Sequence, residues 1–137
     1  HYDLVTLLIG VNNQYRGRDT SEYRLQFNRL LNQSIKFAGS EDSVIVISIP
    51  DYGATPFGQE RNPQKIAKEI ANFNAINLME TQKTRAHYVN ITGISVKARI
   101  DENLVAGDGL HPSGEMYRLW MQKIYPVAKK ILENKNL

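Results

Sequence analysis

Three short apolar runs divide the chain, and each of them predicts a β-strand. The first two, residues 4–9 and 44–49, are nearly continuous and rich in branched side chains, without the polar–apolar alternation of a half-exposed strand. Runs of this kind are typical of strands that are covered on both faces, as in a parallel sheet. The third run, at about residues 87–91, is shorter and more mixed, which favours an outer strand.

Helical patterns follow each of these runs. The first begins at the capping residue Asp19 and ends at Gly39, and the second opens with Asn62 and Pro63, a capping residue followed by a proline in the first turn. The third begins near Ser113, which is a candidate helix cap. Strands that alternate with helices in this order imply right-handed crossovers on a parallel sheet. The sequence therefore predicts an α/β protein, a three-layer α/β/α sandwich.

The third helical pattern carries two further features. Its apolar residues are expected on one side of the helix: Tyr117, Trp120, Met121, Ile124, Val127 and Ile131. Pro126 lies within the pattern, and because proline cannot donate the helical hydrogen bond it predicts a kink or a split into two helices.

The chain contains no internal repeat and no linker, so residues 1–137 are expected to form one domain. A first strand that is buried on both faces needs neighbours on both sides, and a sheet that began with it would leave one edge bare. The chain also opens on His1 and enters an apolar run by residue 4. We therefore expect that further strands precede His1 in a segment absent from this sequence.

Composition and charge exclude several classes of protein. No apolar run approaches the roughly 18 residues that a membrane span needs, so no membrane partner is expected. The net charge of +3 is scattered along the chain, whereas nucleic-acid binding favours a clustered basic face. The absence of cysteine excludes disulfides and thiolate chemistry, and leaves the cellular compartment open. The histidines His1, His87 and His111 lack a second ligand at metal-binding spacing, and no phosphate-binding loop occurs, so neither metal nor cofactor is expected.

Two segments that follow predicted strands carry candidate chemistry. Asp108 lies three residues before His111, and in a tight turn its carboxylate can accept a hydrogen bond from one imidazole nitrogen and leave the other as a general base. The alternative is a turn residue beside a histidine at the end of a helix. Gly10 permits a sharp turn after the first strand, and the amide of Asn12 can face an anionic oxygen. The alternative there is an ordinary asparagine-rich turn.

A third segment, residues 51–58, leaves the middle strand at its carboxyl end, where sites form in parallel sheets. Its aromatic residues, Tyr52 and Phe57, suit a pocket wall that stacks on a sugar ring or covers a short acyl chain. They can equally serve to pin a long loop to the body of the protein.

Taken together, Gly10-Val11-Asn12-Asn13 and Asp108-Gly109-Leu110-His111-Pro112 resemble motifs of the SGNH (GDSL-type) hydrolase family. The resemblance extends to Ser48-Ile49-Pro50 and Phe73-Asn74, and spans nearly the whole chain. It implies the flavodoxin-like fold of that family, with His111 as the catalytic base, Asp108 orienting it, and Asn12 in the oxyanion hole. The family often has aspartate where Asn13 stands.

The sequence departs from the family at its amino-terminal end. The Gly-Asp-Ser block that carries the family's nucleophilic serine, and the block with a further oxyanion glycine, do not occur. We therefore expect the chain to be the last three strand–helix units of the hydrolase domain, inactive alone, and to require the missing amino-terminal segment. The intact protein is expected to cleave small acyl esters, such as an acetylated carbohydrate, through an acyl-enzyme. The alternative is a non-catalytic relative that binds an ester or glycan.

Overall fold

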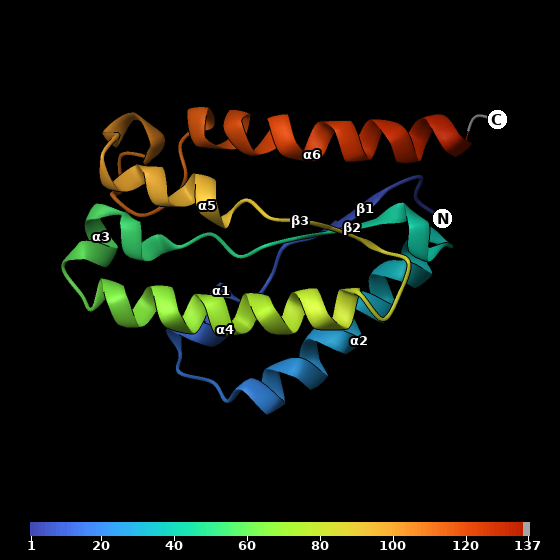
Figure 1. Cartoon of the computed structure of the whole chain (residues 1–137), viewed down its shortest axis with the longest axis horizontal. Helices are drawn as coiled ribbons and strands as arrows, with labels where there is room; N and C mark the ends of the chain where they lie inside the picture. The colour runs from blue at the N-terminus through green and yellow to red at the C-terminus, as the bar shows by residue number, and fades with distance from the viewer. Residues whose placement is uncertain (136–137) are drawn as a thin grey trace.

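The computed structural model describes residues 1–135 of the chain. Within these residues the strands are β1 (Val5–Leu7), β2 (Val44–Ile47) and β3 (His87–Val89). The α-helices are α1 (Val11–Tyr15), α2 (Thr20–Ala38), α3 (Pro56–Gln59), α4 (Pro63–Thr81), α5 (Thr92–Ser95) and α6 (Gly114–Lys135) (Figure 1). Short 3-10 turns occupy Glu41–Ser43, Tyr52–Ala54, Val96–Arg99 and Glu102–Leu104.

The three strands form a parallel sheet in the order β1-β2-β3, which confirms the predicted fold. Val5 pairs with Val44 in the first ladder, and Ile47 pairs with Val89 in the second. The strands are shorter than the apolar runs. Beyond the end of β2, the backbone N–H of Ile49 donates to the Asn74 side chain, whose amide donates back to the Ile49 carbonyl.

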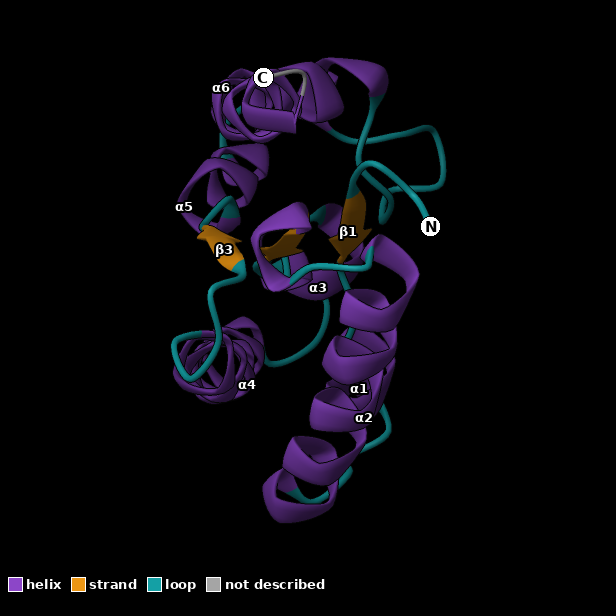
Figure 2. Cartoon of the chain, turned by 90° about the vertical axis from the view of Figure 1, so that its right-hand side faces the viewer, coloured by secondary structure: helices purple, strands orange, loops and turns teal. Residues whose placement is uncertain are grey.

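Helices cover the sheet on both faces and give the predicted three layers, with α2 and α4 on one side and α5 and α6 on the other (Figure 2). Successive side chains of a strand point to opposite faces. Val44 and Val46 accordingly pack into the cluster with α2 and α4, whereas Ile45 and Ile47 pack into the cluster with α6. All four side chains are buried, so β2 is the central strand that its continuous apolar run predicted.

Strand β1 differs from that expectation. Val5 and Leu7 are only partly buried and Thr6 is exposed, although the run was predicted to be covered on both faces. The cause is its place in the sheet, because within residues 1–135 β1 pairs with β2 alone. Its other edge carries unpaired backbone groups.

The predicted helix ends are confirmed. Asp19 caps α2 by accepting hydrogen bonds from the backbone N–H groups of Ser21 and Glu22, at 2.8 and 3.2 Å. Gly39 ends that helix at φ 73°, a left-handed conformation that glycine adopts without strain. Asn62 caps α4 through the N–H of Lys65 at 3.0 Å.

Helix α6 runs unbroken from Gly114 to Lys135, so of the predicted kink or split at Pro126 the split does not occur. Pro126 and Gln122, whose carbonyl loses its helical partner, are both exposed, so water can satisfy that carbonyl. The predicted apolar side is also divided, since Trp120, Ile124 and Ile131 are buried with Met116. Other apolar side chains of this helix remain well exposed: Tyr117, Met121, Tyr125 and Leu132.

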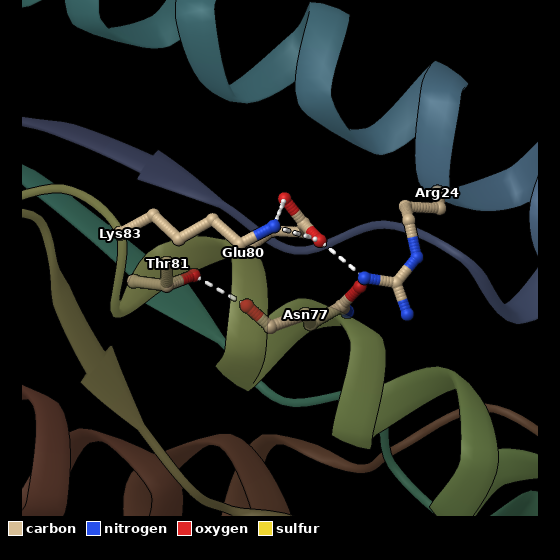
Figure 3. Close-up of polar contacts among 5 residues, drawn as sticks. All are labelled: Arg24, Asn77, Glu80, Thr81 and Lys83. Carbon is tan, nitrogen blue, oxygen red and sulfur yellow. Dashed lines mark hydrogen bonds and ion pairs between the residues drawn. The ribbon is translucent and has the colours of Figure 1, made fainter.

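A buried polar cluster joins α2 to α4 (Figure 3). The Glu80 side chain, only 3% exposed, accepts from Arg24 of α2 at 2.5 Å and from Lys83 at 2.8 Å. The hydrogen bond from Lys83 is the largest cause that lowers the pKa of Glu80. Beside it, Asn77 accepts from the Tyr23 hydroxyl at 2.7 Å, and the Thr81 hydroxyl donates to the Asn77 carbonyl at 2.6 Å. Side chains distant in sequence thus hold the two helices together.

Candidate active site

Gly10 makes the turn from β1 into α1. Its φ of 125° lies in a region that side-chain-bearing residues rarely adopt, and a Cβ there would stand 2.4 Å from the Tyr23 hydroxyl and 2.6 Å from Ile49. The Tyr23 hydroxyl, whose proton goes to Asn77, also lies 3.1 Å from the Ile9 carbonyl oxygen. Only glycine fits this position, and the turn delivers the next residues directly to the carboxyl end of the sheet.

The two asparagines that follow face different surroundings. Asn12 is exposed and lines a cavity that His111 also lines. Asn13 instead donates its side-chain amide to Gln26 of α2 at 2.8 Å. The structure therefore brings Asn12 to the site and holds Asn13 against a neighbouring helix.

Asp108 and His111 lie in a tight turn between the last 3-10 turn and α6. The turn is closed by a backbone bond from Ala106 to the His111 carbonyl at 2.7 Å, and by an antiparallel bridge between Val105 and Pro112. Gly109, at its tip, has a φ of 73°. Beyond the turn, the Ser113 hydroxyl accepts from the N–H of Met116 and so caps α6.

The Asp108 carboxylate organises this turn. One oxygen accepts the backbone N–H groups of Leu110 and His111, both at 2.9 Å, and the other lies 2.5 Å from Nδ1 of His111. These hydrogen bonds, led by the one from the His111 backbone, lower the pKa of Asp108 to about 2. An ionised carboxylate only accepts hydrogen bonds, so Nδ1 carries the proton that it accepts, and Nε2 is the nitrogen left to act as a base. The imidazole is 71% exposed and reachable by a reactant.

A cavity of about 430 Å³ joins these groups. Asn12 and His111 both line it, together with the predicted aromatic residues Tyr52 and Phe57. Tyr15 completes a cluster of three rings whose centroids lie 6.2 to 6.4 Å apart. Sequence reasoning missed Tyr15, although its position one helical turn after Asn12 was an available signal.

A second residue that the sequence did not single out is Asp51. Its side chain lines the same cavity but is 5% exposed, and burial raises the pKa of its carboxyl. One carboxylate oxygen accepts the N–H of Gly53 at 2.8 Å, and the backbone N–H of Asp51 donates to the Ser95 hydroxyl. Asp51 thus anchors the start of the aromatic loop.

The serine hydroxyls near the site are engaged in structural bonds. Ser95 donates to the Thr92 carbonyl at 2.6 Å, and Ser113 donates to the Asn103 carbonyl at 2.6 Å. Ser48 is fully buried and accepts from the backbone N–H of Ile91 at 2.8 Å. Within residues 1–135, no serine hydroxyl is hydrogen-bonded to His111.

Among residues 1–135, no group of three or more histidine and acidic side chains is arranged to hold a metal ion. None of the helices in that same range is long and apolar enough to cross a bilayer.

The parallel three-layer sandwich thus places the Asp108–His111 pair and Asn12 around one cavity. Residues 1–119 match the model of the GDSL-like lipase/acylhydrolase family. The chain belongs to this family.

A solved structure of the psychrotrophic esterase EstA from Pseudoalteromonas sp., inhibited by monoethylphosphonate, has a similar fold, with a TM-score of 0.64 and 19% sequence identity. The match covers 96% of this chain and 63% of the esterase chain, so the protein described here spans less than two thirds of the length of that relative. A search of curated protein sequences finds no match.

Proposed function

We propose that this chain is part of an ester hydrolase to which it supplies the general base and its orienting carboxylate. The observation that carries the proposal is the hydrogen bond between Asp108 and Nδ1 of His111, in a cavity that Asn12 also lines. A histidine held in this way accepts the proton of a nucleophile through Nε2. Asn12 donates its amide to the oxyanion of the tetrahedral intermediate.

The nucleophile in this proposal is a serine in sequence that precedes His1. The engaged serine hydroxyls of residues 1–135 support it, as does the unpaired edge of β1, where a further parallel strand could add. The serine oxygen attacks the ester carbonyl as His111 takes its proton, and the alcohol then leaves with that proton. Water, deprotonated by His111, cleaves the acyl-enzyme and restores the serine.

For the substrate we propose a small acyl ester, such as an acetylated carbohydrate. Tyr15, Tyr52 and Phe57 support it, because three rings beside the histidine form a wall on which a sugar ring can stack. The Arg61 guanidinium lies over the Phe57 ring, 3.2 Å from its centroid. Nitrophenyl esters of increasing acyl length should show activity that declines well before ten carbons. Activity that peaks at ten carbons or more contradicts this choice of substrate.

A phosphonate probe tests the nucleophile. The natural protein, with any sequence that precedes His1, should be labelled once at a serine in that sequence and should hydrolyse small nitrophenyl esters. The chain His1–Leu137 alone should show neither labelling nor robust hydrolysis. Robust turnover by a chain verified by mass to begin at His1 would refute the proposed origin of the nucleophile.

Asn12→Ala tests the oxyanion role in the natural protein. Loss of one such donor commonly lowers kcat by about 10²–10³-fold, and KM should change little. Asn13→Ala is a matched control, because that amide bonds Gln26 and not the cavity, and its kcat should stay within about twofold of the parent. Equal effects of the two substitutions would contradict the assignment of Asn12.

The second candidate function is a binding module that holds an ester or glycan without cleaving it. The high exposure of the aromatic Tyr15, at 57%, favours a binding surface independently of catalysis. The sequence that precedes His1 separates the two functions, since a Gly-Asp-Ser block there supports the hydrolase and its absence supports the binding module.

A further inference from the structure

The turn that carries Asp108 and His111 is tied to a second loop at its tip. The backbone N–H of Phe57, in the first turn of α3, donates to the carbonyl of Gly109 at 3.0 Å. The bonds made by Ala106, Leu110 and His111 are internal to the turn. The bond from Phe57 joins the turn to a part of the chain about fifty residues earlier.

The Phe57 N–H is free to make this bond because it belongs to the first turn of a helix, where N–H groups have no helical partner. Thr55 serves the neighbouring groups, its hydroxyl accepting from Gly58 at 3.2 Å and its carbonyl accepting from Gln59 at 2.9 Å. Gly109 lies close to the same segment, since a Cβ added to it would stand 3.7 Å from Cβ of Pro56.

The loop that presents this N–H is held by hydrogen bonds within itself. The Thr55 hydroxyl donates to the Tyr52 carbonyl at 2.6 Å, and the Gln59 side chain donates to the Gly53 carbonyl at 2.6 Å. At Gly58 the loop closes on itself so tightly that a Cβ would stand 2.1 Å from the Tyr52 carbonyl oxygen. A donor on such a loop constrains the turn that it bonds.

We propose that Phe57 is a positioning residue for the Asp108–His111 pair, acting through its backbone N–H on the Gly109 carbonyl. The inference rests on the proposed function in one respect, the role of His111 as the base. Phe57 then has two separable parts: the ring lines the cavity wall, and the N–H holds the turn in which Asp108 meets Nδ1.

Phe57→Pro removes the N–H, and Phe57→Ala retains it while removing the ring. Gln64 provides a matched control, because it also follows a proline at the start of a helix, α4, and its N–H donates to no group within residues 1–135. Gln64→Pro therefore repeats the same proline–proline step without the loss of a hydrogen bond. Replacement of Phe57 by phenyllactic acid, which exchanges only the N–H for an ester oxygen, covers the case in which Phe57→Pro does not fold.

The first readout is made on this chain by NMR. Leu110 and His111 donate their N–H groups to Asp108, so their amide exchange reports the closed turn. Removal of the Phe57 N–H should accelerate both exchange rates by about three- to tenfold, as the loss of one hydrogen bond predicts. It should also lower the fraction of molecules in which Nδ1 of His111 carries the proton. Phe57→Ala and Gln64→Pro should leave both quantities unchanged.

The second readout is the kinetics of the natural protein. Loss of the N–H should lower kcat with little change in KM, whereas loss of the ring in Phe57→Ala should mainly raise KM. Equal exchange rates at Leu110 and His111 with and without the N–H would overturn the proposal. If removal of the N–H changes those exchange rates but the unsubstituted natural protein hydrolyses no ester, the positioning by Phe57 stands and the proposed function fails.

Discussion

Two carboxylates of this protein each meet basic partners, but in opposite surroundings. Glu80, on α4, is 3% exposed, and its partners Arg24 and Lys83 (Figure 3) are 38% and 62% exposed. Asp108 has a side chain that is 50% exposed, and its partner His111 is 71% exposed at the cavity. Both carboxylates have a lowered pKa.

This difference in burial separates a carboxylate that stabilises the fold, Glu80, from a carboxylate whose partner is accessible to a reactant, Asp108. Glu80 joins helices that are distant in sequence, so its hydrogen bonds contribute to the free energy of folding of the whole domain. Asp108 bonds residues two and three positions ahead of it, so its hydrogen bonds shape one turn. We expect substitutions at the first carboxylate to change stability, and substitutions at the second pair to change activity.

The largest expected effect is that of His111→Ala on ester hydrolysis by the natural protein. Loss of one member of such a triad leaves only about 10³–10⁴-fold catalysis over the uncatalysed reaction. Because the ring is exposed, the melting temperature should not change. His87→Ala, in β3, is the control and should keep its kcat. Hydrolysis near the parent rate by His111→Ala would remove the distinction between the two carboxylates.

Glu80→Gln should have the next largest effect, on stability alone. It keeps the size of the side chain and removes the charge that Arg24 and Lys83 meet, which should lower the free energy of unfolding by about 1–3 kcal/mol. Urea denaturation of the chain measures this loss. An unchanged midpoint would show that the buried cluster in Figure 3 does not stabilise the domain.

Acid should open the turn that Asp108 organises. The pKa of Asp108 in the folded turn is about 2, below its ordinary value of 3.8. A lowered pKa means that the stabilisation is complete above the ordinary value and is lost as the pH falls through about 2. The Leu110 and His111 amide signals should therefore titrate with a midpoint near pH 2, and Asp108→Asn should abolish that transition. A midpoint near pH 4 would contradict the bonding of the turn.

The smallest effect is expected from the exposed pair of Glu115 and Arg118 in the first turns of α6, 2.6 Å apart. Ion pairs in this position gain little because water and salt screen them. Glu115→Gln should leave the urea midpoint unchanged within error, which makes it the surface control for Glu80→Gln. A loss as large as that of Glu80→Gln would show that burial does not set the difference.

The sequence predicted most of the fold because its signals are local. The continuous run of β2 and the caps Asp19, Gly39 and Asn62 each identify an element without reference to the rest of the chain. The exposure of β1 depends on which strands pair with it, and the unbroken α6 depends on which side of the helix Pro126 faces. Neither the exposure of β1 nor the continuity of α6 can be predicted from the local spacing of residues.

The candidate site likewise has features that could be predicted from local sequence and features that could not. Asp108 and His111 lie three residues apart, so their contact could be predicted from sequence, although their catalytic roles remain proposals. The bond between Phe57 and Gly109, the ring cluster completed by Tyr15 and the buried Asp51 depend on loops that meet only in the folded chain.

Gly10 has a consequence for engineering libraries aimed at new substrates. Its position against the Tyr23 hydroxyl leaves no room for a side chain, and the same hydroxyl bonds Asn77 beside the buried cluster. A library that randomises Gly10 would therefore consist mostly of misfolded members, and Tyr23 and Asn77 must be held fixed with it. Diversity is better placed at the ring of Tyr15, which is exposed and lines the cavity.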